Sequence, residues 1–239
     1  MNVLAHAAPP SPETAAPMVT LVVKPYDQLR ARLLESLFVM ASRAETALVM
    51  AMRALVERNN ELADQTIRDD SILDHFELEA DELCVQLLAM APLARELRLI
   101  TVAMKISRNL ERIGDEAVSI AYCARTLNQD APLKPYIDLP LMATISRQML
   151  NAAIGAFIDQ RPDRARDLLP DVTSVDELND QLHRELSSFM IERPSTIPSC
   201  LLLIGVGNAL ERIADHATNI AEDVVYLYEG KDIRHPDRD

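Results

Sequence analysis

With 239 residues, of which 49% are hydrophobic, the chain is long enough to bury a substantial core, and we expect a globular protein rather than a disordered one. Its formal net charge of −13 disfavours nonspecific binding to nucleic acid or to an anionic lipid surface. Cations and basic protein surfaces remain as partners, although the same charge would also simply keep a protein soluble. Three widely spaced cysteines, Cys84, Cys123 and Cys200, indicate neither a disulfide framework nor a zinc cluster and fit a reducing compartment.

The composition favours helices, because Gly is scarce, Trp is absent and an alternating strand pattern is confined to residues 20–23. Residues 1–24 are predicted to form a flexible N-terminal tail, since the first part of this segment lacks the basic and continuous apolar regions of a secretion signal. No stretch approaches the roughly 18 uninterrupted apolar residues of a membrane span. We therefore predict an all-α, cytoplasmic protein.

The spacing of apolar residues predicts three helices in a first unit, residues 25–128, at about residues 27–57, 61–90 and 92–127. Asn59 and Asn60 are expected to end the first of them, and Pro92 to open the third.

A polar stretch with two prolines, residues 128–135, is the predicted boundary between units. The second unit, residues 136–235, is expected to contain helices at about residues 139–159, 161–190 and 196–229. We expect a break in the middle helix at Pro170 and a stop at Gly230.

One hexapeptide occurs twice, on the third predicted helix of each unit. Residues 110–115 read Leu-Glu-Arg-Ile-Gly-Asp, and residues 210–215 read Leu-Glu-Arg-Ile-Ala-Asp. A repeat of this length argues for two copies of one helical unit. At 3.6 residues per turn, the buried seam of the two helices is predicted to consist of Leu110, Ile113, Ala117 and Ile120, and of Leu210, Ile213, Ala217 and Ile220.

Acidic side chains four residues apart recur on the second and third helices. Those on the third helices flank the seam, and the pairs are Glu111 with Asp115, Glu211 with Asp215, Asp70 with Asp74, Glu77 with Asp81, and Asp176 with Asp180. Like charges at this spacing cost roughly 0.2–0.5 kcal/mol, so each pair calls for a compensating cation. Where two such stripes face each other, their oxygens can converge on metal ions.

Two other interpretations remain open. The acids can be solvated helix faces paired with local bases, and Lys105, Arg108 and Arg112 have the spacing to serve as partners. A metal-storing or redox-active carboxylate bundle is the alternative function, but the chain has no Glu-x-x-His, and His216 points about 100° away from Asp215.

Nucleophilic catalysis finds no support in the sequence. The chain has no Gly-x-Ser-x-Gly, no cysteine with a nearby histidine and no phosphate-cradling glycine loop. His75 and His183 are predicted to be helix-surface residues. We therefore expect a protein that is not an enzyme.

The chain resembles the PhoU family, the cytoplasmic regulators of phosphate transport and phosphate-starvation signalling. The resemblance extends over about residues 26–235, and its segments are Leu97-Arg98-Leu99, Met104-Lys105-Ile106, the two hexapeptides, the continuation of the second to Ile220, and the ending Tyr228 to His235.

The resemblance implies two tandem three-helix bundles and no catalytic activity. It also implies that the acidic signatures bind iron, zinc, manganese or magnesium ions, as in some family members. The metal ligands expected on this basis are Glu111, Asp115, Glu211, Asp215, Asp74, Glu77, Asp176, Asp180 and Asn219.

The resemblance further implies an adaptor between the phosphate ABC transporter and the sensor histidine kinase, which restrains uptake and the phosphate-starvation (Pho) regulon when phosphate is ample. We expect a homodimer that reaches the membrane only through protein partners and binds no nucleic acid directly. The copies also differ, because Pro198 and Gly205 stand where the first copy has Arg98 and Lys105. The two acidic faces should therefore differ in charge and in metal affinity.

Overall fold

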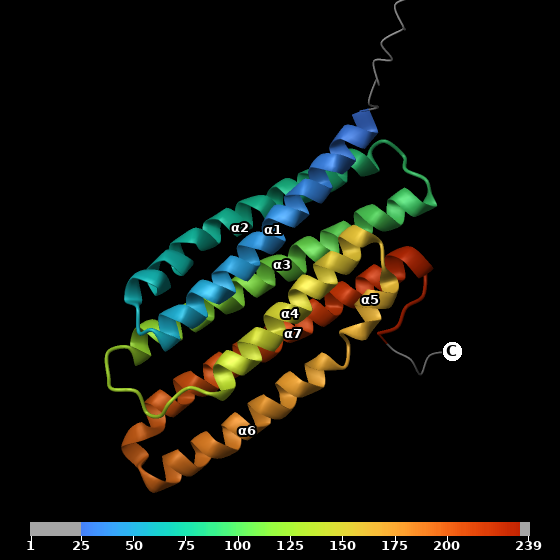
Figure 1. Ribbon diagram of the computed structural model, residues 1–239. Helices are drawn as coiled ribbons and strands as arrows, with labels where there is room; N and C mark the ends of the chain where they lie inside the picture. The colour runs from blue at the N-terminus through green and yellow to red at the C-terminus, as the bar shows by residue number, and fades with distance from the viewer. Residues whose placement is uncertain (1–24, 235–239) are drawn as a thin grey trace, which may run out of the picture.

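The computed structural model describes residues 25–234, and within this range the chain is helical without a strand. The all-α prediction is confirmed, while the predicted tail and His235 lie outside the described residues. In chain order the elements are α1 (Pro25–Val56), α2 (Asn60–Leu88), α3 (Ala94–Leu127), α4 (Asp138–Asp159), α5 (Pro162–Asp167), α6 (Asp171–Glu192), the single 3-10 turn η1 (Pro194–Thr196) and α7 (Ile197–Glu229) (Figure 1).

Local sequence signals account for several helix ends. Asn59 does not end the first helix but begins the second, because its Oδ1 accepts hydrogen bonds from the backbone N–H groups of Glu61 and Leu62, at 3.0 and 3.2 Å. The expected break at Pro170 is present and separates α5 from α6. Gly230 ends α7 in a left-handed conformation with φ of 72°, as its position predicts.

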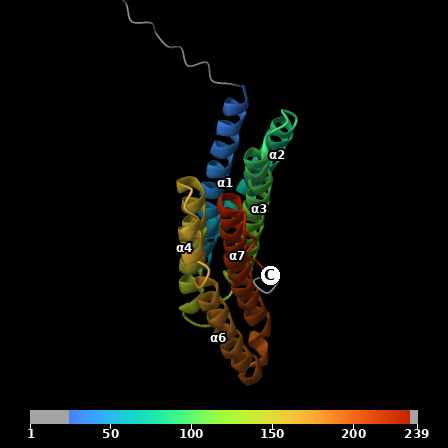
Figure 2. The ribbon, with the colours of Figure 1, turned by 90° about the vertical axis from the view of Figure 1, so that its right-hand side faces the viewer.

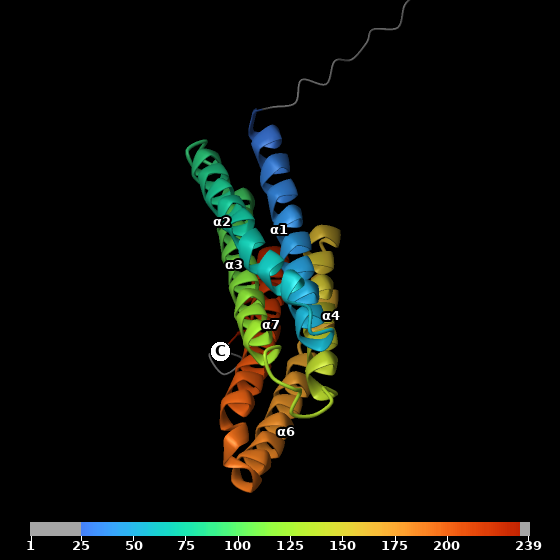
Figure 3. The same ribbon diagram turned by 90° about the vertical axis from the view of Figure 1, so that its left-hand side faces the viewer.

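The helices form two tandem three-helix bundles. Helices α1, α2 and α3 pack on one another, as do α4, α6 and α7, with the short α5 beside α7. The bundles meet where α3 packs against α7 and α1 against α4, while α2 and α6 flank this arrangement on opposite sides (Figure 1). Figures 2 and 3 show that α1 and α4 lie on one face of the molecule and α3 and α7 on the other. The signature helices therefore lie at the centre of the molecule.

The core confirms the predicted seam. All eight seam residues of α3 and α7 are fully buried. The segment Pro194–Glu229 is long and apolar enough to cross a membrane by length and composition alone. Because α7 contacts α3, α4, α5 and α6, we assign this segment as the core helix of the second bundle.

In each bundle the signature helix contains a glycine at which the middle helix approaches closely. A Cβ atom on Gly114 would lie 2.3 Å from Cδ2 of Leu73 in α2. A Cβ atom on Gly207 would lie 2.3 Å from Oδ1 of Asn179 and 2.8 Å from Cδ2 of Leu182, both in α6. The two glycines occupy different positions of the repeat, so the middle helix comes closest to the signature helix at a different point in each bundle.

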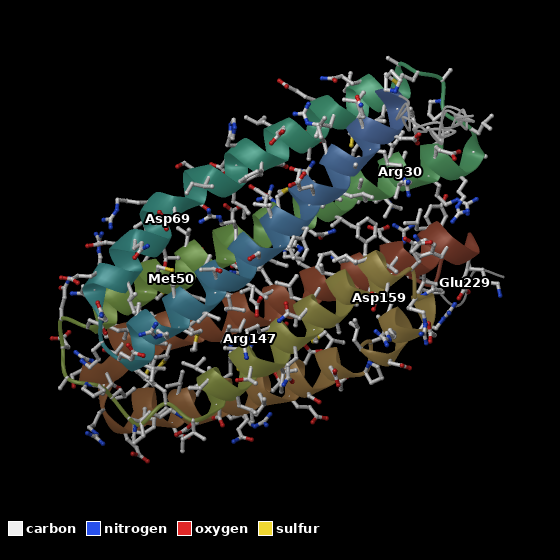
Figure 4. The ribbon with its side chains drawn as sticks, turned by 45° about the horizontal axis from the view of Figure 1, so that its top comes forward. Arg30, Met50, Asp69, Arg147, Asp159 and Glu229 are labelled. Carbon is white, nitrogen blue, oxygen red and sulfur yellow. The ribbon has the colours of Figure 1, made fainter. Side chains whose placement is uncertain are left out.

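Charged side chains cover the outer helix surfaces, as Asp69 on α2 and Arg147 on α4 illustrate (Figure 4). Some of them also join the bundles. Nη1 of Arg147 lies 3.8 Å from Oε1 of Glu45 in α1, and Nδ2 of Asn151 donates to the same oxygen at 2.8 Å. Polar contacts thus support the apolar packing of α1 on α4.

Candidate functional site

The first acidic cluster consists of Asp70, Asp74 and Glu77 on α2 with Glu111 and Asp115 on α3. Burial, followed by the charges of Asp115 and Glu77, raises the pKa of Glu111 to about 7, although the positive charge of Arg112 opposes the shift. Burial also raises the pKa of Asp70, with further contributions from Asp74 and Asp115. The carboxylates of the two helices are therefore close enough to repel one another.

One base partly neutralises this cluster. Nη1 of Arg112 lies 3.2 Å from Oδ2 of Asp115, and its Nε lies 3.5 Å from Oε2 of Glu111. The interpretation that local bases pair with the acids is thus confirmed for Arg112. It is wrong for Lys105, which pairs with Asp223 of α7 at 2.9 Å.

The second acidic cluster consists of Asp176 and Asp180 on α6 with Glu211 and Asp215 on α7. Burial raises the pKa of Asp215, and the charges of Asp176 and Glu211 add to the shift. The pKa of Asp176 is raised in the same way, by burial and then by Glu211 and Asp180. Within residues 25–234, no ion pair reaches any of these four acids. Among the described residues, the second cluster therefore lacks a paired base of the kind that Arg112 provides in the first.

A buried amide positions one carboxylate of the second acidic cluster. The side chain of Asn179 is 5% exposed, and its Nδ2 donates to Oε2 of Glu211 and, at 3.1 Å, to Oδ1 of Asn208. Nε2 of His183 lies 3.0 Å from the same Oδ1. His183 is thus half-buried where α6 meets α7, whereas His75 is exposed on α2, as predicted.

The expected metal ligands did not include two residues of these clusters, Asn179 and Asp70, and each had a signal in the sequence. Asn179 is a polar residue on the buried stripe that contains Val175 and Leu182. Asp70 forms an acidic pair with Asp74. It also lies close to α3, because Gly114 has no side chain there: Oδ1 of Asp70 is 3.7 Å from the position that a Cβ atom on Gly114 would occupy. Reading the apolar stripe for polar interruptions would have found Asn179.

Two residues of α7, Asn219 and His216, line the same cavity against α3. Asn219 lines this cavity together with Lys105 and Arg108. Nδ1 of His216 lies 3.0 Å from Oδ1 of Asn109 in α3, which agrees with the expectation that this histidine points away from Asp215.

The clusters supply ligand atoms for a metal without forming a finished site. Carboxylate oxygens on facing helices are the donors that hard divalent cations take. In the part of the chain that the structure describes, however, no three His, Cys, Asp or Glu side chains stand close enough together to hold a metal ion. Metal binding at either cluster would therefore require side chains to rotate toward one another.

The fold and these clusters define a class of protein: a duplicated helical bundle with one acidic face per copy and two signature helices at its centre. The family described as the PhoU domain matches this chain twice, at residues 37–124 and 139–224. The chain belongs to the PhoU family.

Relatives and solved structures agree with this assignment. The phosphate-specific transport system accessory protein PhoU homolog of Aquifex aeolicus is 38% identical over 84% of this chain and 91% of its own length. The homolog of the same name from Zymomonas mobilis is 36% identical over 87% of this chain and 89% of its own length. The crystal structure of PhoU from Pseudomonas aeruginosa superposes with a TM-score of 0.84 at 33% identity, covering 86% of this chain and 100% of that one.

Proposed function

We propose that this chain is an accessory protein of the phosphate-specific transport system and a negative regulator of phosphate uptake and of the Pho regulon. The observation that carries the proposal is the match of both bundles to PhoU domains, together with relatives that carry this name over most of their length. His183 and His216 both bond asparagine side chains and neither bonds a nucleophile, which fits a regulatory role better than a catalytic one.

The regulatory role is proposed to be that of an adaptor between the phosphate ABC transporter and the sensor histidine kinase. Helices α2 and α6 make no contact with the opposite bundle among the described residues, so each bundle offers one flank for a partner. The acidic character of the chain favours basic surfaces on those partners. The protein would then be cytoplasmic and reach the membrane only through them.

The adaptor role is tested in a strain that lacks the chain. When phosphate is ample, we expect the deletion to raise phosphate uptake and the expression of a Pho reporter, and the intact chain to restore both. Crosslinking in the restored strain should recover the transporter and the kinase. Unchanged uptake and reporter expression in the deletion strain would overturn the proposal.

We further propose that the two acidic clusters bind divalent metal ions, with iron, zinc, manganese and magnesium as the candidates. A bound cation would turn the repulsion between α2 and α3 carboxylates, and between those of α6 and α7, into attraction. The ligands in the first bundle would be Glu111 and Asp115 with Asp74 and Glu77. Those in the second would be Glu211 and Asp215 with Asp176 and Asp180.

Elemental analysis of protein purified without chelator, combined with thermal melting in Mn²⁺, tests the metal proposal. We expect Mn²⁺ to raise the Tm of the wild type, and the rise to be reduced in Glu111→Gln and in Glu211→Gln. Glu82→Gln, at an exposed position of α2, is the matched control and should respond like the wild type. An equal rise in all four proteins would place the binding elsewhere.

Oxygen consumption on addition of ferrous iron separates this proposal from a redox-active bundle. We expect no consumption, because the chain has no Glu-x-x-His motif.

A homodimer is the proposed assembly. Phe38 on α1 is 57% exposed and Ile158 on α4 is 51% exposed, and both line a cavity of about 330 Å³ on the α1–α4 face. Such apolar exposure favours a self-association surface. Sedimentation is expected to show a dimer that Phe38→Asp weakens, and a monomeric wild type would contradict this.

A further inference from the structure

A cavity of about 310 Å³ lies between α3 and α7, and one of its lining residues, Arg112, also contacts the first acidic cluster. Four of the side chains that line it are cationic, namely Lys105, Arg108, Arg112 and Arg234, whereas Asp223 is the only carboxylate among them. We call this cavity the basic groove. Its charge is opposite to that of the chain as a whole, which carries −13. Cationic side chains that line a recess attract anions to the extent that neighbouring carboxylates leave their charge uncompensated.

The cations of the basic groove are unevenly compensated. Nζ of Lys105 lies 2.9 Å from Oδ1 of Asp223, whose side chain is only 7% exposed, so this pair anchors the floor of the groove. Arg234 bonds Asp232, and Arg112 reaches back toward Glu111 and Asp115. Arg108 is exposed and forms no ion pair within residues 25–234. Its guanidinium is the donor that stays available to an anion.

Neutral polar side chains complete the walls of the groove. Nδ2 of Asn109 donates to the backbone oxygen of Lys105 at 3.0 Å, which leaves Asn109 Oδ1 to accept from Nδ1 of His216 at 3.0 Å. This chain of bonds fixes the tautomer and orientation of the imidazole beside the groove. The amide of Asn219, one turn further along α7, is exposed at the same wall. Guanidinium, ammonium and amide donors of this kind recognise phosphate oxygens.

The opposite end of the α3–α7 contact is an internal control, because the repeat places equivalent residues there. Lys105 and Asp223 correspond to Gly205 and Cys123, and a Cβ on Gly205 would lie 3.7 Å from Sγ of Cys123. The same helices therefore meet in the same way at both ends. Only the end that contains the basic groove, here called the first end, has the charged pair. The opposite end is called the second end.

The remaining equivalent positions follow the same trend. Arg108 corresponds to Asn208, so the second end lacks the available guanidinium. Arg112 corresponds to Arg212, which is fully engaged with Glu116 of α3 through two hydrogen bonds of 2.6 Å. The residue of α7 that corresponds to Glu116 is His216, so α7 offers Arg112 no carboxylate at this position. The basic groove is thus a property of one end and not of the fold.

We propose that the basic groove binds a small phosphate-bearing anion, held by the guanidinium of Arg108, the ammonium of Lys105 and the amide of Asn219. A free phosphate ion and the phosphate chain of a nucleotide share this chemistry. The groove is recessed between two helices, and its volume suits a small molecule better than a protein surface.

Isothermal titration calorimetry with the full chain, treated with EDTA to remove metals, tests the proposal. The two probes are inorganic phosphate and ATP without magnesium, and the one that binds more tightly identifies the source of the phosphate. For that probe we expect Arg108→Ala to weaken binding by roughly tenfold or more, since one charge-assisted contact is lost. Arg184→Ala, which removes the same charge from an exposed position of α6, should leave the affinity unchanged.

A second pair of variants uses the repeat itself. Asn219→Asp adds a negative charge to the wall of the basic groove, and Ser119→Asp adds it at the equivalent exposed position of the other end. We expect only Asn219→Asp to weaken binding. Four results would overturn the proposal: no binding of either probe at millimolar concentration, wild-type affinity in Arg108→Ala, equal losses in Arg108→Ala and Arg184→Ala, or equal losses in the two aspartate variants. The measurement needs neither transporter nor kinase.

Discussion

Arg112 and Arg212 occupy the same position in the two copies of the hexapeptide, yet they neutralise different acids. Arg112 stays in its own bundle, beside Glu111 and Asp115, whereas Arg212 crosses to Glu116 of the other bundle. The difference arises because α3 presents Glu116 to Arg212, while α7 presents His216 at the equivalent place. Nearly identical local sequences therefore have different electrostatic environments, which the helix packed against each of them sets.

The largest expected effect concerns the buried seams, in which the two copies are alike. Leu110 and Leu210 are both fully buried in their seams. Leu110→Ala and Leu210→Ala should each lower the free energy of unfolding by about 2–5 kcal/mol, through lost apolar burial and the cavity that remains. Urea denaturation measures both. If one variant lost less than about 1 kcal/mol, the two seams would not be equivalent.

The glycines test where the copies differ. Gly207→Ala should cost about 1–3 kcal/mol, because the new Cβ meets both Asn179 and Leu182 on the packed helix. Gly114→Ala should cost less, since its Cβ meets the end of one side chain, that of Leu73. Gly155→Ala, with open space around the Cβ position in α4, is the control and should be neutral or slightly stabilising. This order would be contradicted if thermal melts showed a larger loss of stability for Gly114→Ala than for Gly207→Ala.

The first acidic cluster should give a pH-dependent stability. Because folding raises the pKa of Glu111 from 4.5 to about 7, the folded state favours the protonated carboxyl. The stability that this protonation contributes is fully present below about pH 4.5 and is lost as the pH rises to about 7. Glu111→Gln should therefore be more stable than the wild type at pH 8, by about 1 kcal/mol after solvent screening, and nearly equal to it at pH 4. Denaturation at both pH values in EDTA checks this, and a difference independent of pH would disprove it.

The smallest effect concerns the ion pair between the bundles. Arg212→Ala should cost roughly 1 kcal/mol or less at low salt, because Arg212 is half-exposed although Glu116 is largely buried. The cost should shrink in 0.5 M NaCl as the charges are screened. The control is Arg53→Ala, which removes the exposed pair of Arg53 with Glu57 at the C-terminal end of α1, and it should have a still smaller effect. A salt-independent loss would instead indicate that the aliphatic part of Arg212 contributes by packing.

Much of the fold could be predicted from local periodicity. The buried seam was predicted residue by residue, since a helix repeats every 3.6 residues whatever surrounds it. The helix ends were close as well, and Asn59 was misread only because an asparagine between two helices can end one or cap the next. Local patterns also predicted that Glu111 and Asp115 share one face of their helix. They could not show that Asp70 of α2 lies close enough to Asp115 for the two charges to interact.

The sequence by itself determined the all-α class, the duplication and the acidic stripes, because each of these depends on residues within a few helical turns of one another. Only the tertiary structure decided which partner each charge meets. Lys105 has the spacing to serve acids on its own helix, yet it lies against Asp223, 118 positions away. Such contacts depend on how α3 and α7 are rotated and placed against each other, and no local repeat encodes that arrangement.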